Sequence, residues 1–157
     1  MIGLYLHIPF CRTRCPYCDF VSNAIRGHPP RPFVIALCQE IAAFAGPVEA
    51  GTVFLGGGTP SLLDPASLEP ILKAVRERFA LVGAEITLEA NPDDVTISMA
   101  QTWKGLGINR VSLGVQSFDD RVLRYLGRRH DAGTARRACE AVASCFANWG
   151  MDLIFGA

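Results

Sequence analysis

The sequence predicts an α/β fold in which parallel strands alternate with helices. Short continuous runs rich in Val, Ile, Leu and Phe recur along the 157 residues, and stripes of apolar residues at helical spacing fall between them. Continuous apolar runs of this length are typical of strands buried on both faces, as parallel strands are. The expected order is βαβαβαβαβ, in one domain over residues 1–157 with right-handed crossovers.

The strands are expected at Leu4–Phe10, Thr52–Leu55, Ile86–Ala90, Val111–Val115 and Asp152–Phe155. Three amphipathic helices are expected from stripes formed by Phe33, Leu37, Ile41 and Phe44, by Leu68, Ile71, Leu72, Val75 and Phe79, and by Ala135, Ala138, Cys139, Val142 and Phe146. A fourth helix, with a weaker pattern, is placed between Ile97 and Leu106.

Local signals fix two of the helix ends. Asp64 followed by Pro65 is typical of an N-cap with proline in the first helical position. Gly107 suits the left-handed conformation that commonly ends a helix.

Composition excludes several classes of partner. The formal net charge is zero, which gives no electrostatic case for nucleic acid or an anionic membrane surface. The arginines between 121 and 137 are interpreted as a solvated helical face. No apolar stretch approaches the roughly 20 residues of a transmembrane segment, and nothing resembles a signal peptide. We therefore expect a cytoplasmic protein with reduced thiols.

Cys11, Cys15 and Cys18 form a C-x-x-x-C-x-x-C pattern directly after the first apolar run. Thiolates are soft ligands that select zinc, copper(I) or iron-sulfur clusters. A closed zinc site needs four protein ligands, but Asp19 and Phe20 follow where a fourth cysteine would stand. Because iron-sulfur cubanes are normally held by four cysteines, three indicate a four-iron cluster with one open iron.

Three alternatives remain open from spacing alone. A zinc site could recruit His7 or Asp19, which would make the chain a zinc-binding structural module. Cys15 and Cys18 could act as a thioredoxin-like redox pair, although that leaves Cys11 unexplained. Disulfides are disfavoured by the absence of a signal peptide and by the apolar, helix-like surroundings of the other three cysteines.

Polar or glycine-rich residues stand at the carboxyl end of every predicted strand, where parallel α/β folds place their active sites. The second strand runs into Gly56-Gly57-Gly58, and glycines let a backbone approach a ligand closely. The third carries Glu89 just before Asn91-Pro92. Beside the cysteine loop, the glycines therefore predict a ligand site.

Five segments in order resemble the radical S-adenosylmethionine (SAM) superfamily, and more narrowly its oxygen-independent coproporphyrinogen III oxidase group, which includes haem chaperones. They are LYLHIPFCRTRCPYCDF at 4–20, FLGGGTPS at 54–61, LEANP at 88–92, NRVSLGVQSF at 109–118 and DLIFG at 152–156. The resemblance implies a radical SAM core domain, built as a (β/α) barrel that is partial here because the sequence stops after about the fifth strand.

The resemblance also implies roles for matching positions. Cys11, Cys15 and Cys18 would bind a [4Fe–4S] cluster whose open iron chelates SAM, and reduction would cleave SAM to a 5'-deoxyadenosyl radical. The expected SAM contacts are Tyr5, Tyr17, Gly57, Gly58, Thr59 and Glu89, with Gln116, Arg128 and Asp152 contacting a second SAM molecule. A buried Glu89 without a partner would be too costly to be an incidental strand residue. No catalytic residue is assigned.

The residue at position 20, a phenylalanine, helps to distinguish the oxidase branch of that group from the chaperone branch. The oxidase branch has a further cysteine two residues after the third, whereas Cys18-Asp-Phe20 resembles the chaperone branch. The resemblance therefore favours a haem chaperone that binds haem in its full-length form, with an oxygen-independent coproporphyrinogen III oxidase as the alternative. Whether it is an enzyme stays open. Expected partners are SAM, haem or porphyrinogen, an electron donor and haem-acceptor proteins. His7, His28 and His130 are interpreted as structural or solvent-facing.

The family's barrel continues beyond a fifth strand, so we expect an amino-terminal fragment of a longer protein. Its last strand would have an unpaired edge, which invites association with other chains. Alone, the fragment is expected to be poorly soluble and catalytically incomplete.

Overall fold

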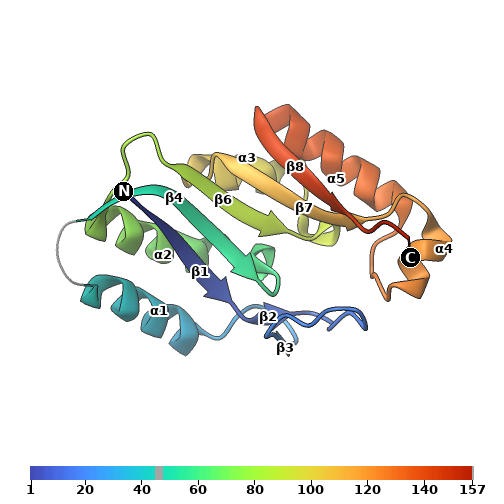
Figure 1. Cartoon of the computed structure of the whole chain (residues 1–157), viewed down its shortest axis with the longest axis horizontal. Coiled ribbons are helices and arrows are strands. Elements are labelled where there is room, and N and C mark those ends of the chain that lie inside the picture. Colours follow the sequence, from blue (N-terminus) through green and yellow to red (C-terminus); the bar gives the residue numbers. More distant parts are fainter. Residues whose placement is uncertain (45–47, 157) are drawn as a thin grey trace.

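The computed structural model describes residues 1–44 and 48–156 and contains one main parallel sheet (Figure 1). Five strands lie across this sheet in chain order: β1 (Ile2–Ile8), β4 (Val48–Gly57), β6 (Glu85–Ala90), β7 (Arg110–Gln116) and β8 (Asn148–Leu153). The two-residue strand β5 (Phe79–Ala80) pairs with β4, and β2 (Phe10–Cys11) pairs with β3 (Asn23–Ala24) in a separate parallel ladder. The predicted α/β fold with parallel strands is confirmed.

The helices connect successive strands and lie on one side of the sheet (Figure 1). A sheet whose strands follow in chain order through right-handed crossovers must place every crossover helix on the same face. This single-sided winding is that of a barrel rather than a doubly wound sheet. The helices are α1 (Arg31–Ala43), α2 (Pro65–Arg78), α3 (Ile97–Gly105), α4 (Asp120–Tyr125) and α5 (Ala132–Cys145), with 3-10 turns η1 (Pro60–Leu62) and η2 (Pro92–Asp94).

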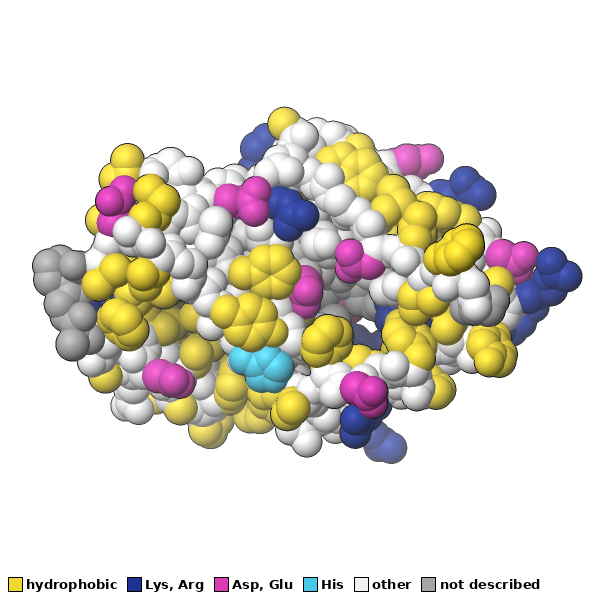
Figure 2. Space-filling view, in the orientation of Figure 1, with side chains coloured by type: hydrophobic (Ala, Val, Ile, Leu, Met, Phe, Trp, Pro, Cys, Tyr) yellow, Lys and Arg dark blue, Asp and Glu magenta, His cyan; other side chains and the backbone are white. Residues whose placement is uncertain are grey.

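The core lies between the sheet and the helices. Leu55, Leu88 and Leu113 from neighbouring strands are fully buried against helix residues such as Ile71 and Val142. Alternate residues point to the other face. The expectation that both faces are buried is wrong there, because Tyr5 is 57% exposed and Asp152 is also exposed. Figure 2 shows hydrophobic, acidic and histidine side chains together on this uncovered face.

Three local predictions are confirmed. The Asp64 carboxylate accepts a hydrogen bond from the Ser67 N–H at 2.8 Å and caps α2, with Pro65 in the first helical position. Gly107 follows α3 with a φ of +95°. The weakly predicted fourth helix is α3, whose cap is the Thr96 hydroxyl.

Several predicted boundaries are wrong. Phe44, Phe79 and Phe146 lie one residue beyond their helices rather than inside them. Apolar spacing made the predicted helices too long, because these rings continue the apolar pattern past the last helical residue and still pack near the core. Phe79 is instead the first residue of β5.

The last strand also differs from the prediction. It begins at Asn148 and ends at Leu153, so Ile154 and Phe155 lie outside it. The polar residues of this strand face the uncovered side, so the sequence from Asn148 to Leu153 lacks the continuous apolar run by which the other strands were predicted. β8 pairs only with β7 within the described sheet, as expected for an open edge.

No helix in the described parts of the chain is long and apolar enough to cross a membrane.

Candidate functional site

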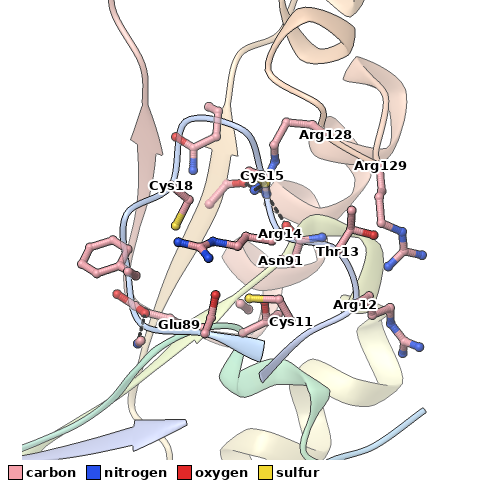
Figure 3. Close-up of a pocket in the computed structure, with 18 of the residues that line it drawn as sticks. Cys11, Arg12, Thr13, Arg14, Cys15, Cys18, Glu89, Asn91, Arg128 and Arg129 are labelled. Carbon is pink, nitrogen blue, oxygen red and sulfur yellow. Dashed lines mark hydrogen bonds between the residues drawn. The ribbon is translucent and has the colours of Figure 1, made fainter. Parts of the chain in front are cut away.

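The carboxyl ends of the strands and the cysteine loop line one pocket (Figure 3). It brings together eleven of the twelve predicted site residues, from segments far apart in the sequence. They are Cys11, Cys15, Tyr17, Cys18, Gly57, Gly58, Thr59, Glu89, Gln116, Arg128 and Asp152. The parallel sheet explains this convergence, because all its strands end at one edge.

The three cysteines lie around this pocket on a loop that begins at the end of β2 (Figure 3). The loop turns through a hydrogen bond from the Cys18 N–H to the Cys15 carbonyl at 3.1 Å. Two side chains from elsewhere donate toward the sulfurs. The Thr59 hydroxyl lies 3.4 Å from Cys11 Sγ, and Arg128 Nη1 lies 3.5 Å from Cys15 Sγ. Donors of this kind stabilise thiolates and the sulfurs of bound clusters.

The chemistry of the three cysteines can be compared with the needs of zinc and of a cluster. All six in the chain are free thiols. Across residues 1–44 and 48–156, no three Cys, His, Asp or Glu side chains converge closely enough to hold a single ion. Zinc would draw its thiolates to about 2.3 Å from one centre. A cluster places each thiolate on a different iron, so three soft donors spread around one pocket fit a [4Fe–4S] group.

The glycines at the end of β4 leave no room for a side chain, Gly58 because of neighbouring backbone and Gly57 because of the His7 ring. The Gly58 N–H donates to the Ile8 carbonyl at 2.9 Å, and a Cβ on Gly58 would stand 2.6 Å from the Phe10 carbonyl oxygen. Gly57 has a φ of +112°, and a Cβ there would meet the His7 ring at 2.4 Å. The sequence predicted that glycine permits approach to a ligand. The structure adds that it lets the end of β4 pack against the start of the cysteine loop.

Glu89 has the partner that its burial requires. Its Oε2 accepts a hydrogen bond from the Gly57 N–H at 3.1 Å. Burial raises the pKa of the Glu89 carboxyl, and the charge of Asp152 adds to this, while the Gly57 hydrogen bond and His7 oppose it. A second carboxylate oxygen is left to accept a hydrogen bond inside the pocket.

The two predicted tyrosines differ in position. Tyr17 lines the pocket, and its hydroxyl lies 3.3 Å from Arg128 Nη1. Tyr5 is the predicted site residue that does not line it. Its ring stacks on Phe54 and its hydroxyl lies 3.2 Å from His7 Nδ1. Burial, followed by the nearby charge of Glu89, raises the pKa of Tyr5.

Arg128 is held on the side of the pocket formed by the cysteine loop. Besides Cys15 and Tyr17, its guanidinium donates to the Gly114 carbonyl at 2.7 Å and to the Asn91 side chain. Gln116 and Asp152 line the same pocket from the ends of β7 and β8. Arg128 therefore connects the cysteine loop to the ends of β6 and β7.

Sequence reasoning missed a polar network around η2. Asp94 accepts a hydrogen bond from the Ser61 hydroxyl at 2.7 Å and pairs with Arg12 of the cysteine loop at 3.6 Å. Ser61 in turn accepts from the Asn91 N–H at 3.1 Å. In Figure 3, Arg12 and Arg129 extend away from the cysteines. The available signal was Asn91-Pro92 at a strand end, but nothing in the spacing connects that turn to Arg12.

The radical SAM superfamily profile matches residues 5–156. The chain belongs to the radical SAM superfamily. Curated relatives include the proteins named haem chaperone HemW from Escherichia coli, 40% identical over 161 residues, and from Synechocystis, 44% identical over 165 residues. These alignments cover 99% and 97% of this chain but 43% and 39% of the relatives. The chain thus spans about two fifths of the length of those radical SAM proteins.

Among solved structures, the coproporphyrinogen III oxidase HemN from Escherichia coli superposes with a TM-score of 0.88 at 33% identity, over 99% of this chain and 37% of that one. A SAM-bound anSMEcpe structure shares the fold alone, with a TM-score of 0.66 at 15% identity. The arrangement of this radical SAM chain is therefore that of a partial barrel, as the sequence predicted.

Proposed function

We propose that this chain is the cluster- and SAM-binding part of a radical SAM protein of haem metabolism, of the haem chaperone type. The observation that carries the proposal is the pocket in which three cysteines face Gly57, Thr59 and the Glu89 carboxylate. Membership of the superfamily and the HemW relatives support it.

In this proposal, Cys11, Cys15 and Cys18 hold a [4Fe–4S] cluster, which in this superfamily supplies an electron for reductive cleavage of SAM. The chain's own residues bind and orient. The N–H groups of residues 57–59 already donate within the chain, so their carbonyl oxygens and the free oxygen of Glu89 are the acceptors offered to the polar groups of SAM. Arg128 and Thr59 place positive charge and a hydroxyl donor beside the sulfurs, which offsets the thiolates' negative charge.

Two features favour the chaperone over the oxidase. Phe20 occupies the place of the oxidase branch's further cysteine and is 67% exposed. The curated relatives reported above carry the name haem chaperone. The oxidase remains the second candidate because of the close superposition on HemN. Haem, a haem acceptor and an electron donor are proposed as partners of the whole protein, and the cytoplasm as its location.

Haem titration separates these candidates. The protein, with the segments that complete the length of its relatives, would be loaded anaerobically with cluster and titrated with haem with and without SAM. A parallel sample would receive coproporphyrinogen III, SAM and a reductant. Saturable haem binding without porphyrinogen decarboxylation supports the chaperone. Decarboxylation with multiple turnovers would establish the oxidase instead, and bound zinc in place of iron would contradict both.

A further inference from the structure

The backbone at the end of β7 adopts a conformation that L-residues avoid. Gln116 has a φ of +66°, the one positive φ recorded for a non-glycine residue in the described chain. The Ser117 N–H donates to the Val115 carbonyl at 2.8 Å, two residues back. This bond closes a γ-turn centred on Gln116, and the form with a positive central φ is rare and strained. Strain of this kind persists only where surrounding contacts enforce it.

Two contacts enforce this turn. His130 Nε2 lies 3.0 Å from the Val115 carbonyl oxygen, which therefore receives a second hydrogen bond. From the other side, the Ile154 N–H donates to the Gln116 carbonyl at 2.9 Å. His130 is 4% exposed, and its Nδ1 has no hydrogen-bond partner in the described residues. Because a carbonyl oxygen can only accept, His130 Nε2 carries a proton and donates it to Val115.

The strained turn places the Gln116 side chain close over Gly114. That side chain lines the pocket, and its Nε2 stands 3.1 Å from the position that a Cβ on Gly114 would take. Gly114 therefore leaves the room in which Gln116 folds back over β7. Strand alternation already assigns residue 116 to the face of Ser112 and Gly114, which line the pocket, and the turn sets how far the Gln116 side chain folds back along that face.

We propose that His130 is a positioning residue that holds the strained turn at Val115–Ser117 and thereby aims Gln116 into the SAM pocket. This inference rests on the proposed binding of SAM. His130 itself does not line the pocket, so it acts through the Val115 carbonyl. The following residue, Asp131, caps α5 through the Thr134 N–H at 2.6 Å. The helix start thus anchors the imidazole.

The test compares His130→Phe, which keeps a ring but removes the donor, with His130→Gln, whose amide restores one. Gln116→Ala and the double variant complete a cycle. SAM affinity is measured on cluster-loaded protein, after iron content and thermal unfolding confirm that each variant is folded. We expect about 5- to 10-fold weaker SAM binding in His130→Phe and in Gln116→Ala, no further loss in the double variant, and near-wild-type binding in His130→Gln.

Amide hydrogen exchange at Ser117 gives a readout that does not depend on SAM. Loss of the hydrogen bond from His130 to Val115 should speed this exchange at least about tenfold in His130→Phe. The exchange should be unchanged in His130→Gln, which keeps a donor. Unchanged Ser117 exchange in a folded His130→Phe, or additive losses of SAM affinity, would overturn the inference. A different outcome would separate the two proposals. If wild-type protein holds a cluster but does not bind SAM, while His130→Phe still speeds exchange at Ser117, the proposed function fails and the role of His130 in holding the turn is supported.

Discussion

Glu89 at the end of β6 accepts a hydrogen bond from the backbone N–H of Gly57 at the end of β4, over 3.1 Å. The contact joins two neighbouring strand ends beside the cysteine loop. It keeps a partly buried carboxylate in the pocket, which Asp152 near the end of β8 also lines. Burial nevertheless raises the pKa of Glu89, so its charge is held there against a desolvation cost.

Glu89→Gln should stabilise the chain while weakening its binding of SAM. Because the folded pKa of Glu89 is raised above the ordinary 4.5, its contribution to stability is fully present below pH 4.5 and is lost as pH rises through the folded pKa. At pH 7 the neutral amide avoids that loss. Urea unfolding of cluster-free protein should show the variant's advantage at pH 7 shrinking toward pH 4.5.

Glu85→Gln is the matched control. Glu85 lies on the same strand but its side chain is 42% exposed and pairs with Arg110 at 4.0 Å. Its replacement should change stability by less than about 0.5 kcal/mol. An advantage for Glu85→Gln as large as that for Glu89→Gln would show that general charge reduction, rather than burial of Glu89, is responsible.

Gly58→Ala should damage the site through the backbone. Its Cβ would stand 2.6 Å from the Phe10 carbonyl and 2.8 Å from the Ile8 carbonyl, and neither can move without shifting the start of the cysteine loop. We expect a loss of about 1–3 kcal/mol in the free energy of unfolding. Gly51→Ala is the control, because its Cβ meets only the flexible Met1 side chain. Equal losses in the two variants would contradict this assignment.

Asp94→Asn should loosen the cysteine loop. The Asp94 side chain is 8% exposed and pairs with Arg12, which is 38% exposed, so the ion pair is partly shielded from solvent. We expect faster loss of iron to a chelator, with a similar effect for Arg12→Ala. The control pair Lys73 and Glu77 is 68% and 66% exposed, and its removal should cost about 0.3–0.5 kcal/mol and leave iron retention unchanged. If Asp94→Asn keeps its iron against the chelator as well as wild type does, the Asp94–Arg12 pair does not hold the cysteine loop in place.

His130 should make stability depend on pH. Burial lowers the pKa of its imidazole below the ordinary 6.5, and the charge of Arg128 adds to this, while the Val115 hydrogen bond, Asp93 and Asp131 oppose it. As pH falls below 6.5, the unfolded chain takes up a proton first, so stability present above that pH is lost. Wild type should therefore lose more stability between pH 7 and 5 than His130→Gln. Parallel curves for the two proteins would refute this.

Much of the fold and site could be predicted because the signals are local. The run after β1 carries its cysteines within eight residues, and Asp64-Pro65 or Gly107 act on neighbouring atoms. Strand ends converge by topology alone, so Glu89, Gln116 and Asp152 could be placed in one pocket before their contacts were known.

The remainder depends on contacts between distant segments. Arg12 meets Asp94, and His130 meets Val115, through loops whose paths no periodicity describes. Tyr5 was expected in the pocket. Its ring lies on the same uncovered face as Asp152, but it stands three residues before the end of β1 and stacks on Phe54, which no sequence pattern indicated. The positive φ of Gln116 also gave no sequence signal, because glutamine rarely adopts it.

Electron paramagnetic resonance of anaerobically reconstituted, dithionite-reduced protein, before and after addition of SAM, tests whether the three cysteines hold a four-iron cluster that binds SAM. Three cysteines around a pocket that also holds Gly57 and Glu89 predict a four-iron signal whose shape changes when SAM binds. Replacing Cys15 with Ser should abolish the signal, whereas Cys38→Ser should preserve it. A colourless protein with stoichiometric zinc would contradict the proposed cluster, and a cluster signal that does not change with SAM would contradict the proposed SAM site.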